Sequence, residues 1–331
     1  MTSNSGRRGF VEISEITKAP AWRRVLDWSR EELMHRFGQP AGLERVIKTS
    51  VLVPVPVTPP ADTFWTRSVI AWNEWLDSSS SSFYFARPYT LDYRKPDGTG
   101  HFEGHIVAIP EVENLIQETI IHNFQCDIGL LKGMSSSKSE SYDIADINDL
   151  SVLRRPELAE PVTPEHLQEN MSHGGLRLGS MRFSEYPWSE RRYYWHNEDG
   201  SHHFSAARYQ AAQLQQSVLL TGTLYRYKVN GEMIPALRNK WHMFVIPKEE
   251  LFGSFYESMK AFESPFAWSA LPANMHDSME SGVELCIVWL ERDNVRSCSV
   301  ANVLTRYGFP DFGEMLQGLA RCEHTDPVLD C

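Results

Sequence analysis

The amino-acid sequence predicts an α+β protein on three observations. Helix start and stop residues flank several amphipathic segments, aromatic and polar residues alternate in others, and short apolar runs near the C-terminus are typical of buried strands. The chain has 331 residues, of which 42% are hydrophobic and 23% are charged. This composition is that of an ordinary globular protein, and the length allows one large domain or two of usual size.

Residues 1–132 are expected to form an N-terminal region of helices and one hairpin. Apolar residues recur at helical spacing in residues 19–37 and again in residues 63–76. Residues 82–109 alternate aromatic with polar residues around an Asp-Gly turn, which predicts a β-hairpin. Residues 111–124, EVENLIQETIIHNF, are predicted to form a further amphipathic helix.

A serine-rich stretch, GMSSSKSES, is the best linker in the sequence and is expected to mark a domain boundary at residues 133–141. It separates the N-terminal region from a core predicted at residues 142–220. A C-terminal α/β extension is expected over residues 221–331. In that extension, strands are predicted at residues 221–229, 240–247 and 282–291, with helices between and after them.

The predicted core opens with residues 142–150, YDIADINDL, which we expect to form a short strand running into a turn. A helix should follow, because Thr163 suits the N-cap, Pro164 the first helical position and Gly174 the end. Two strands are expected next, in LRLGSMRF and RRYYWHNED. The last element of the core is a helix from Ser201 to about Leu219.

The start of this last helix is the best candidate binding site in the sequence. Gly200 permits a backbone angle that other residues avoid, and it lets a ligand approach the main chain. The first N–H groups of the helix, at Ser201 and His202, point outward beside the positive end of the helix dipole. A phosphate is the natural partner for such a place. The alternative is that Asp199 or Ser201 simply caps the helix.

The two histidines at this helix start are not equivalent. At 100° per residue, an apolar stripe is formed by Phe204, Ala207, Ala211, Leu214 and Val218. His202 lies roughly opposite this stripe, together with Ser205 and Tyr209, whereas His203 lies on its flank. We therefore expect His202 to face the mouth of the pocket and His203 to be half-buried.

The order of helix, glycine, two strands and D-G-x-H-x-x-x-A-A resembles the ParB/sulfiredoxin-like fold. In this sequence the first box of that superfamily would be DINDLSVLRRPELAEPVTPEHLQENMSHGGLRL, and the second would be YYWHNEDGSHHFSAARYQA. Gly200, His202, Ala206 and Ala207 match the second box. His203 stands where the family usually has arginine, whose planar fork imidazole cannot copy. The resemblance covers about 80 residues of the chain.

The resemblance implies a pocket for the phosphates of a nucleotide. Its phosphate-binding residues would be Gly200, Ser201, His202 and His203, with His202 also serving as a catalytic general acid. Arg177, Arg182, Arg191 and Arg192 lie on or near the preceding strands, and one or two of them, Arg177 and Arg192 in our assignment, would supply the charge that His203 does not. Glu198 and Asp199 would hold magnesium beside a bound nucleotide. The alternative for each arginine is a solvated strand face.

The sequence therefore favours binding of a nucleotide or another phosphate ligand at Gly200–His203, with hydrolysis of a nucleoside triphosphate as the associated reaction. Two other hypotheses remain open. The first is a non-catalytic protein-interaction module, in which this turn only caps a helix. The second is a metal-dependent nuclease.

Charge and hydropathy narrow the partners further. The net charge of −11 argues against a general grip on duplex DNA, although a local basic groove remains compatible with it. No apolar run approaches the roughly 20 residues that a membrane span needs. The N-terminal residues lack the apolar core of a secretory signal, and the five cysteines include no C-x-x-C pair. We therefore expect a cytoplasmic protein with reduced cysteines.

Overall fold

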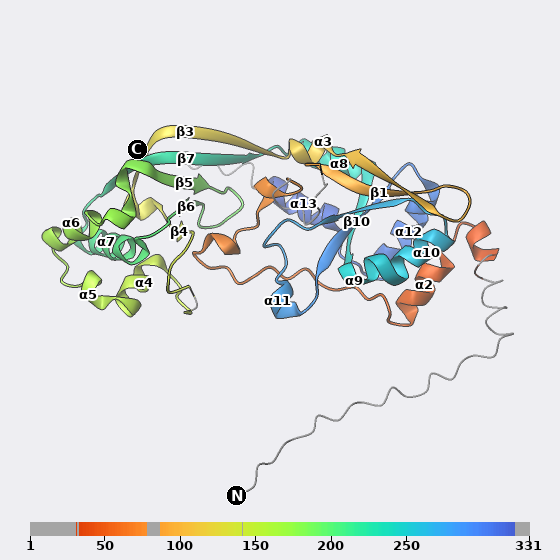
Figure 1. Cartoon of the computed structure of the whole chain (residues 1–331), viewed down its shortest axis with the longest axis horizontal. Helices are drawn as coiled ribbons and strands as arrows, with labels where there is room; N and C mark the ends of the chain where they lie inside the picture. Colours follow the sequence, from red (N-terminus) through yellow and green to blue (C-terminus); the bar gives the residue numbers. More distant parts are fainter. Residues whose placement is uncertain (1–30, 32, 78–86, 141, 322–331) are drawn as a thin grey trace, which may run out of the picture.

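A computed structural model describes residues 31, 33–77, 87–140 and 142–321. The predicted α+β class is confirmed, since the described residues form two five-stranded sheets, each with helices packed beside it. The molecule is elongated, and each sheet lies in its own half (Figure 1).

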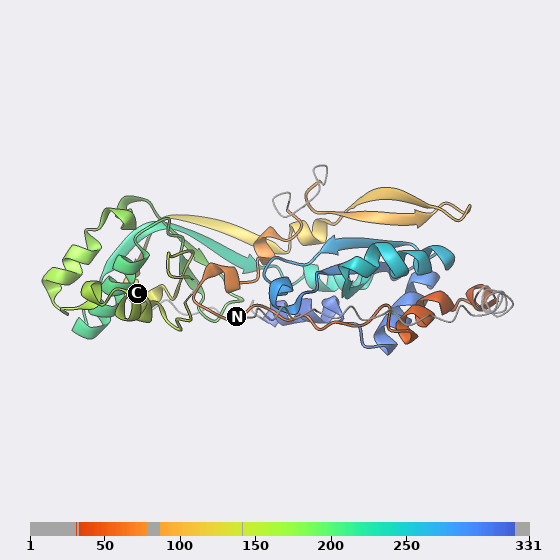
Figure 2. The same cartoon turned by 60° about the horizontal axis from the view of Figure 1, so that its bottom comes forward.

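The first sheet has the strand order β2-β1-β9-β10-β8, with every neighbouring pair antiparallel. Its strands are β1 (Thr90–Pro96), β2 (Phe102–Ala108), β8 (Trp241–Pro247), β9 (Phe266–Ala270) and β10 (Leu285–Glu291). The predicted hairpin is confirmed as β1 and β2, which form the edge of this sheet in Figure 2, although its residues 82–86 lie outside the described part. The strands predicted at residues 240–247 and 282–291 are confirmed as β8 and β10.

The first sheet is buried on both faces at strands β8 and β10, which explains the continuous apolar run of β10. Ile287 and Trp289 belong to one core cluster, and the alternate residues Cys286 and Val288 belong to another. Successive side chains of a strand point to opposite faces, so both faces of β10 need apolar residues. This half therefore contains two cores separated by one sheet.

The second sheet has the order β3-β7-β5-β6-β4. Its strands are β3 (Ile116–Asp127), β4 (Gly133–Met134), β5 (Met181–Glu185), β6 (Tyr193–Trp195) and β7 (Leu219–Val229). The pairs β5–β7 and β4–β6 are parallel, whereas β3–β7 and β5–β6 are antiparallel. The long ribbon of β3 and β7 runs from this half to the other (Figure 1).

The helices divide between the two halves. Those around the second sheet are α4 (Ile147–Arg154), α5 (Pro156–Ala159), α6 (Pro164–Met171) and α7 (Ser201–Leu214). The others are α2 (Ala41–Lys48), α3 (Pro110–Glu113), α8 (Met233–Lys240), α9 (Lys248–Glu250), α10 (Tyr256–Ala261), α11 (Ser278–Ser281), α12 (Val295–Arg306) and α13 (Phe312–Ala320). Over the described residues, no helix combines the length and the apolar character that a bilayer crossing requires.

The helix predicted at residues 111–124 is wrong beyond its first turn. Only α3 is helical there, and the chain continues as β3, which pairs with β7 along most of its length. Ile116, Ile120 and Ile121 are β-branched, and such side chains favour strands when a partner strand is available. Periodicity could not show that partner, because β7 lies about 100 residues further along the chain.

The predicted helix at residues 63–76 is also absent. Two short 3₁₀ turns occur instead, at Thr66–Ser68 and Trp72–Glu74. The hydroxyl of Ser68 donates to the Thr63 carbonyl oxygen (2.8 Å) and accepts from the Thr63 N–H (3.2 Å), so it offers the backbone a local alternative to a helix. The helix predicted at residues 19–37 lies mostly outside the described residues, and 33–36 are helical.

The expected linker is an ordered part of the second sheet and its surroundings. Gly133 and Met134 form β4, which pairs with β6, so β3 and β4 share one sheet with β5 to β7. Residues 142–150 do not form the predicted strand, because Asp146 caps α4 by accepting a hydrogen bond from the N–H of Asn148. The helix predicted after Thr163 is confirmed as α6, with Thr163 accepting from the N–H of His166.

Candidate functional site

The helix α7 is central to the second half of the molecule. It ends at Leu214 rather than Leu219, because Gln215 has a left-handed backbone (φ 55°) and the chain enters β7 at Leu219. As predicted, Phe204, Ala207 and Ala211 are buried in the core of this half. This side of the helix therefore fixes α7 against the second sheet.

The opposite side of α7, which carries His202 and Ser205, packs against other helices. Ser205, placed with His202 on the polar side, is fully buried and accepts a hydrogen bond from the N–H of Ser151 in α4 (2.8 Å). Gln210 is also buried, and its amide donates to the Ala159 carbonyl oxygen at the end of α5 (3.1 Å). Helices α4, α5 and α6 pack against α7, and its first turn lines an open cavity.

The first turn of α7 begins at Gly200, which has a left-handed backbone with φ 73°. A Cβ atom at this position would lie 2.8 Å from the carbonyl carbon of Gly175, so both the angle and the close packing require glycine. No side-chain hydrogen bond caps the helix. The capping interpretation is therefore wrong: the Ser201 hydroxyl donates instead to Ser137, and the N–H of Gly200 lowers the pKa of the Asp199 carboxyl.

A cavity of about 650 Å³ opens at this helix start. Its walls come from four segments: residues 136–139, the α4–α5 junction, His173 after α6, and residues 197–203. The lining residues are Ser136, Ser137, Lys138, Ser139, Arg154, Arg155, Leu158, His173, Asn197, Glu198, Asp199, Gly200, Ser201, His202 and His203. The cavity is thus lined by cationic, hydroxyl, imidazole, carboxamide and carboxylate groups, with Leu158 as the one aliphatic side chain among them.

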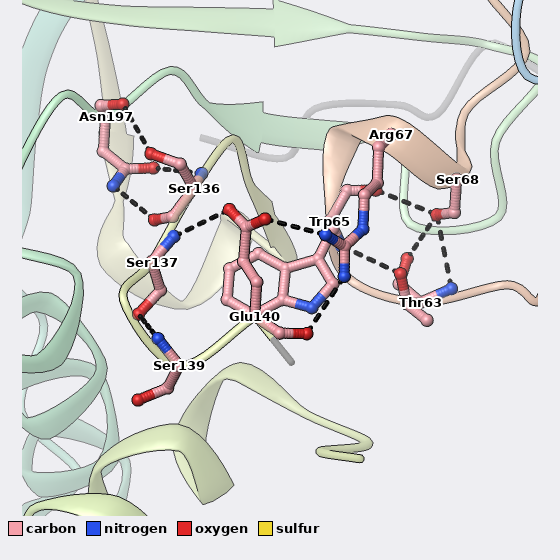
Figure 3. A network of polar contacts seen from close by, with 9 residues as sticks. All are labelled: Thr63, Trp65, Arg67, Ser68, Ser136, Ser137, Ser139, Glu140 and Asn197. Atoms are coloured by element: carbon pink, nitrogen blue, oxygen red, sulfur yellow. Dashed lines mark hydrogen bonds and ion pairs between the residues drawn. The ribbon is translucent and has the colours of Figure 1, made fainter. Parts of the chain in front are cut away.

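Two anchors hold the serine loop, residues 135–140, against the cavity (Figure 3). On one side, the Asn197 carboxamide accepts from the N–H groups of Ser135 and Ser136, both at 3.1 Å, and donates to the Ser136 carbonyl oxygen at 2.7 Å. On the other side, Glu140 accepts from the N–H of Ser137 (2.9 Å) and pairs with Arg67 (2.7 Å). The loop is therefore a fixed wall of the site.

His202 faces this wall. Its Nε2 atom lies 3.0 Å from the hydroxyl oxygen of Ser139. Burial, together with repulsion from Arg155 and Arg154, lowers the pKa of His202 below its ordinary value, and Glu157 opposes that shift. The imidazole is therefore neutral at neutral pH and able to accept a proton.

His203 has different surroundings. Its ring stacks on that of His173, with the centroids 3.8 Å apart, and its Nδ1 atom lies 2.9 Å from the carboxamide oxygen of Asn170. Burial and repulsion from His173 lower the pKa of His203. The structure is thus consistent with a half-buried His203, which takes part in the wall rather than in an arginine-like grip.

The two arginines assigned to the phosphate do not meet in the cavity. Arg177 has a left-handed backbone between two 3₁₀ turns and pairs with Glu198. Arg192 pairs with the buried Glu185 (2.5 Å) and is not among the residues that line the cavity. The assignment of Arg192 is therefore wrong, because its guanidinium neutralises a buried carboxylate elsewhere.

The cations of the cavity come from segments that sequence patterns assigned to other roles. Lys138 lies in the stretch expected to be a linker. Arg154 and Arg155 lie at the end of α4, a helix that begins within residues 142–150, where a strand and a turn were expected. The guanidinium of Arg154 lies over the ring of Tyr142, 3.4 Å from its centroid. The one feature of the sequence that could have indicated these cations is the adjacent pair Arg154-Arg155, which directly follows an apolar helical segment.

The predicted metal ligands do not form a metal site of protein side chains. Glu198 pairs with Arg177 and also lies 3.3 Å from Arg182, so its carboxylate is already neutralised. Within the described ranges, no group of three or more histidine, cysteine, aspartate or glutamate side chains is arranged to hold a metal ion. The metal-dependent nuclease hypothesis thus gains no protein ligand set from these residues.

Comparison with known proteins gives a family. Residues 121–327 match a family described as "Family of unknown function (DUF6685)", and this match covers more than half of the chain. The chain therefore belongs to that family. The matched range contains every residue that lines the cavity. No curated protein and no solved structure matches the chain.

Proposed function

We propose that the cavity at the start of α7 binds a phosphate-bearing ligand, with a nucleoside triphosphate as the favoured class. The observation that carries this proposal is the convergence of Lys138, Arg154 and Arg155 on an uncapped helix start. Unpaired N–H groups and the helix dipole favour an anion at such a place. Hydroxyl groups of Ser137, Ser139 and Ser201 would add donors around it.

The balance of charge in the cavity favours an anion. Glu198 is neutralised by Arg177 and Arg182, which leaves Asp199 as the acidic side chain with no arginine partner among the pairs around the cavity. Against it stand three cationic side chains, of which Arg155 pairs with Glu157 (2.6 Å). The net local charge is therefore positive within a protein whose overall charge is −11.

The size and shape of the cavity favour a small ligand over a nucleic-acid strand. Its volume lies within the range of roughly 300–1,000 Å³ that is usual for small-molecule sites. The cations converge on one cavity, whereas binding of a strand would need a basic stripe along the surface. Leu158 is the one aliphatic side chain that lines the cavity and no aromatic side chain other than histidine lines it, which favours recognition through phosphates rather than through a base.

The order α6, glycine turn, β5, β6, glycine turn and α7 supports the resemblance to the ParB/sulfiredoxin-like fold, and we retain that core as part of the proposal. Hydrolysis of the bound nucleotide belongs to the same proposal. The cavity at the helix start favours ligand binding over a purely structural role for the turn.

Thermal unfolding in the presence of ligands tests the proposal. ATP, CTP, GTP and inorganic phosphate, each with and without magnesium, should raise the Tm of the full chain if they bind the folded state. At a hundredfold excess of ligand over Kd, the free energy of unfolding should rise by about 2.7 kcal/mol. The double variant Arg154→Gln, Arg155→Gln should lose most of the shift. Arg321→Gln, an exposed arginine after α13, should keep it. An unchanged Tm at millimolar concentrations of all four ligands would contradict the proposal.

A further inference from the structure

Ser139 and His202 form a hydroxyl–imidazole pair inside the cavity. The Ser139 Oγ and His202 Nε2 atoms are 3.0 Å apart, within reach for proton transfer between a nucleophile and its base. Both residues line the cavity, although Ser139 is only 7% exposed. The hydroxyl is therefore shielded from bulk water and open toward a bound ligand.

The serine is held in place by its own loop. The N–H of Ser139 donates to the Ser137 hydroxyl at 3.2 Å, and the N–H of Ser137 donates to the Glu140 carboxylate at 2.9 Å. Arg67 fixes that carboxylate from outside the loop (Figure 3). A catalytic hydroxyl needs such support, because small displacements of a nucleophile from its base reduce rates strongly.

The surroundings suit both members of the pair. Burial, together with Arg155, Arg154 and Lys138, lowers the pKa of His202, so the ring is available as a base. The same cations, with the N–H groups at the start of α7, would stabilise negative charge that develops on the serine oxygen and on a phosphoryl group. The hydroxyl, the base and the anion-stabilising groups thus meet in one cavity.

We propose that Ser139 is a catalytic nucleophile for phosphoryl transfer, with His202 as its general base. This inference rests on the proposed function, because it requires a phosphate ligand in the cavity. The substrate class is a phosphoanhydride, of which a nucleoside triphosphate is the test case. The reaction is hydrolysis through a phosphoserine.

The reaction proceeds in two balanced steps. In the first, Oγ of Ser139 attacks the terminal phosphorus, the bond from phosphorus to the bridging oxygen breaks, and the hydroxyl proton moves to Nε2 of His202. The nucleoside diphosphate leaves. Once the imidazole has released that proton to solvent or to the product, it accepts a proton from water, which attacks the phosphoserine. The phosphorus–Oγ bond breaks, the Oγ of Ser139 takes the proton from Nε2 of His202, and inorganic phosphate is released.

Phosphate release from ATP by the full chain, followed together with thermal unfolding, tests this step. Ser139→Ala and His202→Gln should each lower the rate at least a hundredfold, which is typical for loss of a nucleophile or a general base, while ATP still raises the Tm. In the wild type, acid quenching and peptide mapping by mass spectrometry should find phosphate on Ser139. The wild-type rate should also fall as the pH drops through the pKa of His202.

The matched controls lie in the other half of the molecule. Ser258 in α10 is 7% exposed like Ser139, and His242 in β8 is half-buried, so Ser258→Ala and His242→Gln should keep the wild-type rate. Wild-type turnover by Ser139→Ala would overturn the inference. Stabilisation by ATP without phosphate release or phosphoserine would overturn it too, together with the proposed hydrolysis, while leaving the proposed binding of a phosphate ligand intact. Absence of stabilisation by any phosphate ligand would overturn both.

Discussion

Neighbouring histidines of this chain differ in what surrounds their rings. His202 faces a serine hydroxyl in the cavity, whereas His203 stacks on His173. A third histidine, His196, lies just before the turn, and its Nε2 atom is 2.6 Å from the Ser184 hydroxyl oxygen. Burial, assisted by Arg182, lowers the pKa of His196 to about 4. The helical wheel separates His202 from His203, whereas the burial of His196 is seen only in the folded chain.

The low pKa of His196 predicts a loss of stability in mild acid. The unfolded chain binds a proton at this residue below about pH 6.5, whereas the folded chain resists it down to about pH 4. The free energy of unfolding should therefore fall by up to about 3 kcal/mol from this residue as the pH drops across that window. Urea unfolding between pH 7 and pH 4 should show a flatter dependence for His196→Gln.

The control for this pH series is His105, an exposed histidine on β2. His105→Gln should keep the pH dependence of the wild type. If the curves of His196→Gln and of the wild type run parallel, burial of His196 does not govern acid stability.

At the scale of elements, the site depends on two turns packed against each other. The turn before α7 contains Gly200, and the turn after α6 contains Gly175, with the Gly200 N atom 3.0 Å from the position of a Cβ atom on Gly175. This contact sets where the first turn of α7 begins. It therefore also sets where the N–H groups of the helix point.

Gly200→Ala should destabilise the protein by about 2–5 kcal/mol. The left-handed backbone of residue 200 costs about 1–2 kcal/mol with a side chain, and the overlap with Gly175 adds about 1–3 kcal/mol. Gly282 has a similar backbone (φ 69°), but a methyl group added there would meet no atom within 4 Å, so Gly282→Ala should cost only the backbone contribution of about 1–2 kcal/mol. Denaturant unfolding measures both. Equal losses would mean that the contact between the turns is relaxed without cost.

Elements whose signals are local could be predicted from the sequence, and elements that depend on distant partners could not. Thr163 and Pro164 located α6, and the alternation around Asp97-Gly98 located the β1–β2 hairpin. By contrast, β3 has residues at helical spacing and became a strand because β7 pairs with it. The same contrast explains why only part of the site could be predicted from the sequence. Gly200–His203 is a local signal, whereas Arg154, Arg155 and Ser139 reach the cavity only through tertiary packing.

At the scale of the whole molecule, the chain builds the first sheet in two visits. It forms β1 and β2, crosses to the second half for β3 to β7, and returns for β8 to β10. The cavity lies entirely in the second half, lined by residues 136–203. A ligand there should consequently act on one half of the molecule.

Hydrogen exchange in the presence of ATP should show this asymmetry. Because mass action stabilises the folded state that holds the ligand, protection should rise in α7 and in residues 133–140. Amides of β8 and β10, in the sheet of the other half, should keep their exchange rates under conditions where local opening dominates. Equal protection in both halves would show that they open as one cooperative unit.

The pairing of Ile116 with Val229 at the end of the β3–β7 ribbon has a consequence for protein engineering. The residues between them form one continuous stretch of chain whose two ends lie side by side, so the stretch joins the rest of the molecule at one place. Such a stretch is suited to exchange between related chains without altering the path of the host. Phe64 and Trp65 would remain behind, although both belong to the core of the transferred half. An exchange that preserves this half therefore requires the short segment with Phe64 and Trp65 to be exchanged as well.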